Sequence, residues 1–372
     1  MQVELISSIT QFVPTRRNPD PDRVPVAALA AEADGFDSVL VGYTSSRADG
    51  WAVTSRALCA TSRLRILLAH RPGMIAPTLA ARMAATVATF YDRRLSLNIV
   101  TGGSAIDQRR EGDYADHDTR YERSMEYIDV LRRCWGATEP FNFEGRFYRA
   151  ESVFQDLPIS DPADIPLYMG GSSAPALEMA GTRADVFMSW SEPVDDVATR
   201  VHDVLGRAAA HGRRPRVSVS MRLIIGSTED EAWSVANSIV DPAKAQERLA
   251  GRRDHSEDVG RNRQLNLARS GLVLDDRLWM GIVAATGGQG SSGALVGTAD
   301  QVTESLLKYV SAGADALLLT GPDGAYKKFP DGFLADLRSE ADKIVAARWA
   351  PESPPGAAPG RAGADSDQKA LS

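Results

Sequence analysis

Residues 167–180 read LYMGGSSAPALEMA, an apolar run that passes through two glycines and two serines into a segment with helical spacing. Strand, tight turn and helix in this order make one βα unit of an α/β protein. Eight short runs rich in Val, Ile and Leu recur along the chain, with helix-like stretches between them: Val3–Ile9, Ser38–Gly42, Leu64–Ala69, Leu95–Val100, Pro166–Met169, Val186–Trp190, Val217–Ile225 and Ala316–Thr320. Such runs are typical of parallel strands covered on both faces. We therefore predict a (β/α)8 barrel, the TIM-barrel architecture.

Two segments interrupt this rhythm, and we expect one barrel domain over residues 1–350 that carries both as insertions. At about 136–165, the aromatic alternation of GATEPFNFEGRFYRAES predicts a small hairpin. The stretch at about 241–292 is long and charge-rich and ends in TGGQGSSG, so we expect a mobile lid. The tail, 351–372, has few apolar residues, and we expect it to be disordered.

Composition excludes several classes of function. The net charge of −7 over 372 residues, with acids and bases interleaved, disfavours a nucleic-acid partner. No run approaches the ~18 apolar residues of a membrane span, and MQVELISSIT does not read as a secretory signal, so we expect a cytoplasmic protein. Cys59 and Cys134 lie in predicted helices among apolar neighbours, which indicates buried thiols in a reducing compartment. We find no metal-binding motif and expect no metal.

The reactive groups of a barrel come from the carboxyl ends of its strands, and here those ends are rich in anion-binding residues. Gly171 lets the backbone approach an oxyanion, while Ser172 and Ser173 add hydroxyl donors at a helix start, which indicates a phosphate site. A tight turn with a serine cap is the alternative interpretation. In LNIVTGG (97–103), Asn98 and Thr101 end a strand and are suited to hydrogen-bond a planar heterocycle or its sugar chain.

These segments, together with RPGMIAPTLAARMAAT (71–86), DHDTRYERS (116–124), SWSEP (189–193) and GALVG (293–297), resemble the bacterial-luciferase-like flavin monooxygenases. The alkanesulfonate monooxygenase branch is the most similar. The resemblance covers about residues 30 to 340, and so many short matches in one order are a specific signal. It implies a barrel enzyme that takes reduced FMN from a separate flavin reductase and oxygenates a small organic substrate with O2. It also implies a homodimer or homotetramer.

The resemblance assigns cofactor contacts residue by residue. It implies that Tyr121 holds the FMN phosphate with Ser172 and Ser173, and that Asn98, Thr101 and His117 line the path of the cofactor. Thr119 with Glu122 predicts a helix start beside them. The alternatives to these cofactor contacts are that Tyr121 packs on the barrel and that His117 is a solvated loop residue.

The departures from the alkanesulfonate branch concern the substrate. Arg47 replaces the cysteine before that branch's Asp-x-Trp, and residues 220–222, Ser-Met-Arg, replace its Arg-x-His pair. Thr286 and Pro322 replace an arginine and a tyrosine, although Tyr326 is placed to compensate as a substrate contact. We therefore do not expect a plain alkanesulfonate as the substrate.

The residues found in place of that set point to an anion. Arg47, Arg71 and Arg222 are suited to bind a carboxylate, sulfonate or sulfinate, so the expected substrate is small and anionic, with organosulfur compounds included. Arg71 paired with an acid below the pocket is the alternative. His70, ending the third strand, is a candidate general acid or base, or a structural residue that caps a carbonyl. We take His70, Arg222 and the strand-ending Trp190 as catalytic candidates.

Three other functions remain open at this point. Related barrels transfer hydride to or from a deazaflavin, and a non-catalytic flavin-binding paralogue would also keep the phosphate site. A barrel aldolase or isomerase is disfavoured, because no lysine ends a predicted strand to form a Schiff base.

Overall fold

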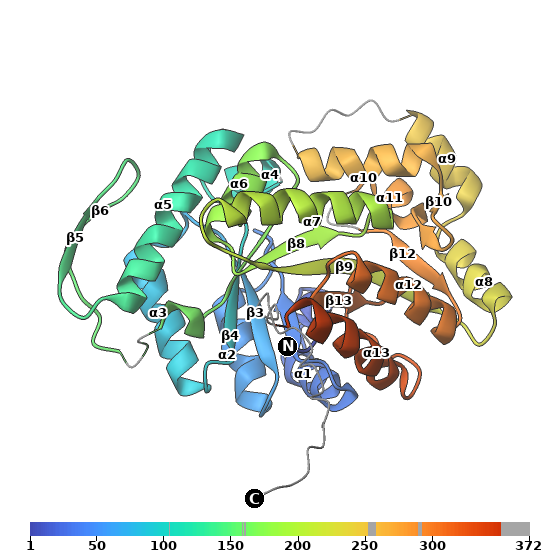
Figure 1. Ribbon diagram of the computed structural model, residues 1–372, viewed down its shortest axis with the longest axis horizontal. Helices are drawn as coiled ribbons and strands as arrows, with labels where there is room; N and C mark the ends of the chain where they lie inside the picture. Colours follow the sequence, from blue (N-terminus) through green and yellow to red (C-terminus); the bar gives the residue numbers. More distant parts are fainter. Residues whose placement is uncertain (104, 158, 160, 252–257, 289–291, 351–372) are drawn as a thin grey trace, which may run out of the picture.

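Eight parallel strands form a closed barrel in the computed structural model, which describes residues 1–350 apart from 104, 158, 160, 252–257 and 289–291 (Figure 1). In chain order the barrel strands are β1 (Glu4–Ser8), β2 (Ser38–Val41), β3 (Arg65–His70), β4 (Leu95–Ile99), β7 (Leu167–Gly170), β8 (Val186–Trp190), β9 (Arg216–Ile225) and β13 (Ala316–Thr320). Each pairs with the next, and β13 pairs with β1 to close the ring. All eight predicted strands and the barrel are thereby confirmed.

Helices follow the strands and surround the barrel. The longer ones are α1 (Arg23–Asp34), α2 (Gly50–Ala60), α3 (Pro77–Phe90), α5 (His117–Gly136), α6 (Ala174–Arg183), α7 (Val194–Ala209), α8 (Glu229–Ile239), α12 (Ala299–Ser311) and α13 (Phe333–Arg348). A short helix, α4 (Ala105–Arg110), precedes α5. In the described part of the chain no helix is long and apolar enough to cross a membrane.

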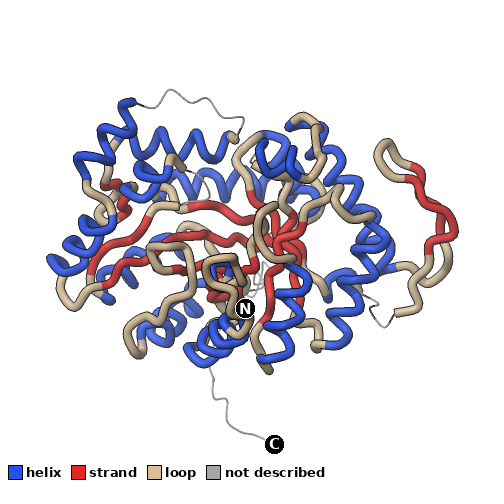
Figure 2. The backbone as a smooth tube through the Cα atoms, turned by 180° about the vertical axis from the view of Figure 1, so that it is seen from behind, coloured by secondary structure: helices blue, strands red, loops and turns tan. Residues whose placement is uncertain are grey.

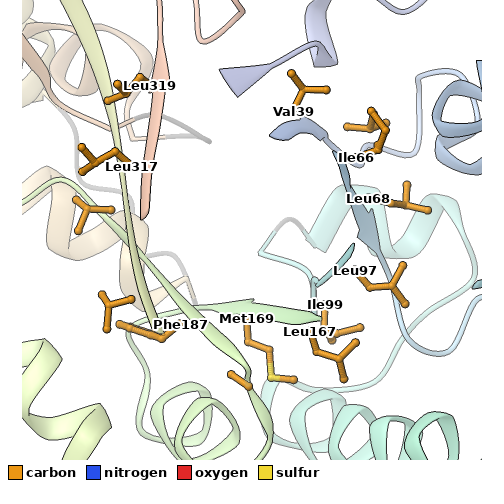
Figure 3. Close-up of a cluster of buried hydrophobic side chains, with 14 of the residues drawn as sticks. Val39, Ile66, Leu68, Leu97, Ile99, Leu167, Met169, Phe187, Leu317 and Leu319 are labelled. Carbon is orange, nitrogen blue, oxygen red and sulfur yellow. The ribbon is translucent and has the colours of Figure 1, made fainter. Parts of the chain in front are cut away.

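The alternation of side chains along each strand separates two cores. Residues such as Ile66, Leu68, Leu97 and Leu317 point away from the barrel axis and pack against the helices (Figure 3). The intervening side chains fill the barrel interior, among them Ile6, Leu67, Tyr168, Val186 and Leu318. By the same alternation Arg71, Asn98, Trp190 and Arg222 lie on the inner side at the carboxyl ends of their strands.

The segment between α5 and β7 contains an antiparallel pair, β5 (Phe141–Glu144) and β6 (Arg149–Val153). It stands away from the barrel in both overall views (Figures 1 and 2). The carboxylate of Glu126 on α5 accepts hydrogen bonds from the amides of Phe147 and Tyr148 in its turn. These bonds attach the turn of the hairpin to α5.

The segment at 241–292 contains α9 (Pro242–Gly251), α10 (Val259–Ser270), α11 (Gly281–Thr286) and two short strands, β10 (Val273–Leu274) and β11 (Leu278–Trp279). The strands extend the sheet through β12 (Ala294–Gly297), which runs parallel to the outer half of β9. In α10, Gln264, Leu265 and Ala268 are buried. Residues 289–291 of the predicted hinge and the tail 351–372 lie outside the described residues, so the mobile lid stays a prediction.

Two local predictions were wrong. Helix α5 begins at His117, because the side chain of Asp116 accepts from the amide of Thr119 and caps the helix three residues before the expected start. Cys134 is buried, but Cys59 is exposed on α2, because it lies on the face of that helix opposite Ala57 and Leu58. Both thiols are free.

Candidate functional site

The loop after β7 forms a narrow cradle at the mouth of the barrel. Gly171 has φ of +143°, and a Cβ there would lie 2.6 Å from the Cβ of Ala176 and 3.2 Å from the hydroxyl oxygen of Tyr121. Helix α6 starts directly after Ser173, whose Oγ accepts from the amide of Ala176 at 3.4 Å. The predicted serine cap is therefore present, and the serine hydroxyl still has its own proton to donate.

Tyr121 reaches this cradle from α5. The side chain is only 7% exposed, but its hydroxyl oxygen is not among the fully buried atoms, and it has no hydrogen-bond partner among the described residues. Its ring lies 4.9 Å from that of His117, whose Nδ1 is 2.7 Å from Asp118. The hydroxyl therefore lies beside Gly171 with its proton available to an acceptor from outside the chain.

The start of α10 lies against the same cradle. A Cβ on Gly260 would be 3.6 Å from the Oγ of Ser172 and 3.4 Å from the ring of Trp190. Asp258 caps α10 by accepting from the amide of Arg261, and it also lies close to Gly103 after β4. The amino termini of α6 and α10 therefore both lie near Ser172. That of α6 favours an anion there, whereas that of α10 is already capped by the carboxylate of Asp258.

Asn98 and Thr101 lie on the neighbouring strand. Asn98 occupies the inner side of β4, which pairs directly with β7, and is half-buried. Thr101, just beyond the strand, is also half-buried. Neither side chain has a hydrogen-bond partner within the described ranges. The structure thus brings Asn98, Thr101 and the cradle to one side of the barrel mouth.

The structure does not bring the three predicted arginines together. Arg71 is buried and paired with Glu111 at 2.6 Å. This ion pair agrees with the alternative prediction for Arg71, a pairing with an acid of the protein. Its guanidinium also lies over the ring of Tyr43, 5.1 Å from the centroid. Arg47 is exposed and donates to Gln11 at 3.0 Å. Only Arg222 lies inside the mouth without a partner of its own: its Nη1 is buried and unbonded.

His70 does not face the barrel interior. It shares the outward side of β3 with Ile66 and Leu68, and its Nε2 is 2.8 Å from the hydroxyl of Tyr127 on α5. Burial lowers the pKa of its imidazole to about 4, so the ring is neutral near pH 7. The structure therefore favours a packing role for His70.

Tyr326 also points into the helix layer. Its hydroxyl donates to the carboxylate of Asp34 at the end of α1, and its ring packs against Phe12 and Phe36. With its hydroxyl bonded there, Tyr326 is not placed to contact a substrate inside the barrel.

Residues 1–316 match the family model described as luciferase-like monooxygenase. The chain belongs to this family. As a luciferase-like monooxygenase it is an oxidoreductase, and the predicted family is confirmed. The alkanesulfonate branch stays a prediction.

Solved structures similar to this luciferase-like monooxygenase share its barrel. EDTA monooxygenase (EmoA) from Chelativorans sp. BNC1 superposes with a TM-score of 0.70 at 17% identity, with 94% of each chain covered. Riboflavin lyase (RcaE) with modified FMN and riboflavin gives 0.70 at 19%, covering 94% of this chain and 92% of that one. An F420-dependent secondary alcohol dehydrogenase gives 0.64 at 18%, covering 93% and 99%. At such identities the likeness shows the fold alone.

Sequence reasoning predicted the segment around α10 only as a mobile lid and did not identify which of its residues meet the cradle of this luciferase-like monooxygenase. Gly260 is almost 90 positions from Ser172, and the charge pattern of its segment does not single it out. Asp258 at the start of a periodic segment was the available signal, because an aspartate there predicts a helix cap. Nothing local indicates which loop that helix start faces.

Proposed function

We propose that this luciferase-like monooxygenase binds reduced FMN at the barrel mouth and uses O2 to oxygenate a small anionic organic substrate. The observation that carries the proposal is the hydroxyl of Tyr121, which lies beside the loop of Gly171 and has no hydrogen-bond partner among the described residues. A phosphate monoester is an acceptor of suitable charge and size for this hydroxyl, the two serines and the first amides of α6.

The remaining residues fit the rest of a flavin. Asn98 on the strand next to the cradle and Thr101 just beyond that strand have side chains with no hydrogen-bond partner among the described residues, and the ring of His117 packs at a tilt against that of Tyr121. Bound reduced FMN would supply the electrons that activate dioxygen. The chain itself has to bind and orient the two ligands and exclude water, a role that α10 and Trp190 are placed to perform.

The family resemblance also supplies the partners in this proposal. Reduced FMN would come from a separate flavin reductase in a transient encounter, and the enzyme would be a homodimer or homotetramer. Organosulfur anions remain in the substrate class. Because Arg222 replaces part of the alkanesulfonate branch's active-site set, we expect sulfite release from short alkanesulfonates to stay near background.

An anaerobic titration tests the cofactor. Reduced FMN should bind, and Tyr121→Phe should weaken that binding severalfold without changing the melting temperature, because the lost hydroxyl has no partner among the described residues. Reduced F420 is the comparison ligand, since a structural neighbour is described as dependent on it. Preference for F420 with hydride transfer would replace this proposal.

Turnover needs a second measurement. The enzyme, a flavin reductase, NADH and FMN are incubated under labelled dioxygen with a panel of small carboxylates, sulfonates and sulfinates. Incorporation of labelled oxygen into product supports the proposal. FMN binding without oxygenation of any member would instead support a non-catalytic flavin-binding protein.

A further inference from the structure

Arg222 occupies a defined position at the barrel mouth. It follows Ser218 and Ser220 on the inner side of β9, whereas Val219, Met221 and Leu223 pack outward. At this residue β9 leaves the barrel, because Arg222 is in register with Thr320 of β13 on one side and Ala294 of β12 on the other. The guanidinium is therefore held where the barrel and the inserted segment meet.

Arg222 differs from every other buried arginine in the described part of the chain. Arg71 is paired with Glu111 and Arg200 with Glu192, while Arg120 donates to the carbonyl oxygens of Ala115 and Gly102. Arg222 is 9% exposed and donates no side-chain hydrogen bond to any described residue. Burial lowers the pKa of its guanidinium, and the nearby charge of Asp323 acts in the opposite direction.

The loop after β13 packs closely against this guanidinium. Gly324 has φ of +76°, and a Cβ there would lie 3.0 Å from Nη2 of Arg222. Asp323 is exposed and forms no ion pair with Arg222; its Oδ1 accepts from the amide of Ala325 instead. An arginine remains charged even when buried, so this charge has no close counter-ion among the described residues.

A second anion at Arg222 would be separate from the cofactor phosphate. The phosphate cradle follows β7, Arg222 ends the barrel part of β9, and β8 lies between them. Two strand spacings amount to about 10 Å. Trp190, which is in register with Ser220, fills the position between the two sites. The mouth therefore has two places for negative charge, of which the cradle accounts for one.

We propose that Arg222 is a specificity-determining residue whose guanidinium pairs with the anionic oxygens of the substrate, in a carboxylate, sulfonate or sulfinate group. The inference rests on the proposed function and deepens it, because it assigns the substrate's anion to one residue and removes Arg47 and Arg71 from that role. Its planar array of donors suits two-oxygen recognition of such groups.

A physical consequence separates this role from a structural one. If an arginine stabilises the fold, its replacement lowers the stability of the protein. If it is a buried charge without a counter-ion, it destabilises the ligand-free protein, and its replacement does not lower the stability. Arg222→Met keeps much of the side-chain volume and removes the charge. Its melting temperature without ligand should equal or exceed that of the wild type.

The test uses thermal shift in flavin-free protein at constant ionic strength, with acetate and methanesulfonate as probes. The wild-type melting temperature should rise with probe concentration, and that of Arg222→Met should rise distinctly less, because only the cradle is then left to bind an anion. Arg183→Met is the matched control, because it removes an arginine paired with Asp129 at the far end of α6, and it should keep the wild-type response. Arg222→Gln gives a second, polar variant in case the methionine variant folds poorly.

Turnover then adds a second readout. Arg222→Met should raise KM for an anionic substrate by about tenfold or more, the scale for a charged hydrogen-bonded pair, and leave reduced FMN affinity unchanged. The inference is overturned if Arg222→Met and Arg222→Gln both melt below the wild type and the probes do not raise the melting temperature of the wild type. Binding of the probe anions does not require flavin. If the probes still raise the melting temperature but FMN does not bind, the result contradicts the proposed function and leaves the role of Arg222 in anion binding supported.

Discussion

Arg263 on α10 donates from Nε to the buried carboxylate of Glu192, just beyond β8, over 2.7 Å. The next residue, Gln264, is fully buried and donates to the carbonyl oxygen of Ser191 at 3.0 Å. Glu192 is also bound by Arg200 of α7. The helix that lies against the cradle after β7 is thereby attached to the end of a barrel strand, and any lid movement of α10 has to break these contacts.

Arg263→Met should loosen α10 without unfolding the barrel. Arg263 is 37% exposed, so its ion pair contributes less than about 1 kcal/mol to global stability. Hydrogen exchange over 259–270 should nevertheless accelerate severalfold in the free enzyme and slow again with reduced FMN. Asp196→Asn, which removes only the more exposed contact of the same arginine at 3.2 Å, should change little. Equal exchange with and without FMN would identify the segment as a static insertion.

Ser172→Ala and Ser173→Ala should separate binding from stability. Both should weaken binding of reduced FMN, by about 1–2 kcal/mol each, the scale of a hydrogen bond to a charged group. Only Ser173→Ala should also reduce the free energy of unfolding, by about 1 kcal/mol, because Ser173 caps α6. Isothermal titration and denaturant unfolding of the two variants check this. Unchanged FMN affinity in the double variant would exclude the cradle as the phosphate site.

Gly171→Ala should destabilise the protein by more than backbone strain alone predicts, because the added Cβ also enters the cradle. The positive φ and the 2.6 Å approach to Ala176 predict a loss of about 1–3 kcal/mol in unfolding free energy, together with loss of FMN binding. Gly112→Ala is the control: its φ is +76° but a Cβ meets nothing within 4 Å, so it reports strain alone, about 1–2 kcal/mol. Normal FMN binding by Gly171→Ala would show that no ligand approaches this loop.

His70 should make the fold sensitive to mild acid. The unfolded chain protonates histidine near its ordinary pKa of 6.5, whereas burial lowers the pKa of His70 to about 4 in the folded protein. The unfolded state therefore binds more protons between these values, and the free energy of unfolding falls as pH is lowered through this window, by up to about 1.4 kcal/mol per pH unit.

Two variants check the origin of this dependence in urea unfolding from pH 7 to 4. His70→Gln has no titrating ring, so its pH profile should be flatter than that of the wild type. Tyr127→Phe removes the hydrogen-bond partner but keeps the burial that lowers the pKa, so it should retain the wild-type slope. A flat profile for Tyr127→Phe would show that the hydrogen bond, rather than burial, causes the effect.

The sequence by itself determined the barrel and the cradle. The eight apolar runs match the eight barrel strands, and the motif around Gly171, Ser172 and Ser173 forms the predicted strand–turn–helix junction. These features are local: strand propensity, glycine at a positive φ and a serine cap each depend on a few neighbouring residues.

The tertiary structure alone decided which polar side chains face the barrel mouth and which of them already have partners. The sequence of β3 is apolar on both faces, so it does not indicate that His70 points outward. In β9 polar and apolar residues do alternate, but the alternation alone does not say which of the two faces is the barrel interior. The pairing of Arg71 with Glu111 joins residues 40 positions apart, and that of Tyr326 with Asp34 spans 292. Arg222 has no ion-pair partner among the described residues, because the fold brings none of their acids against it.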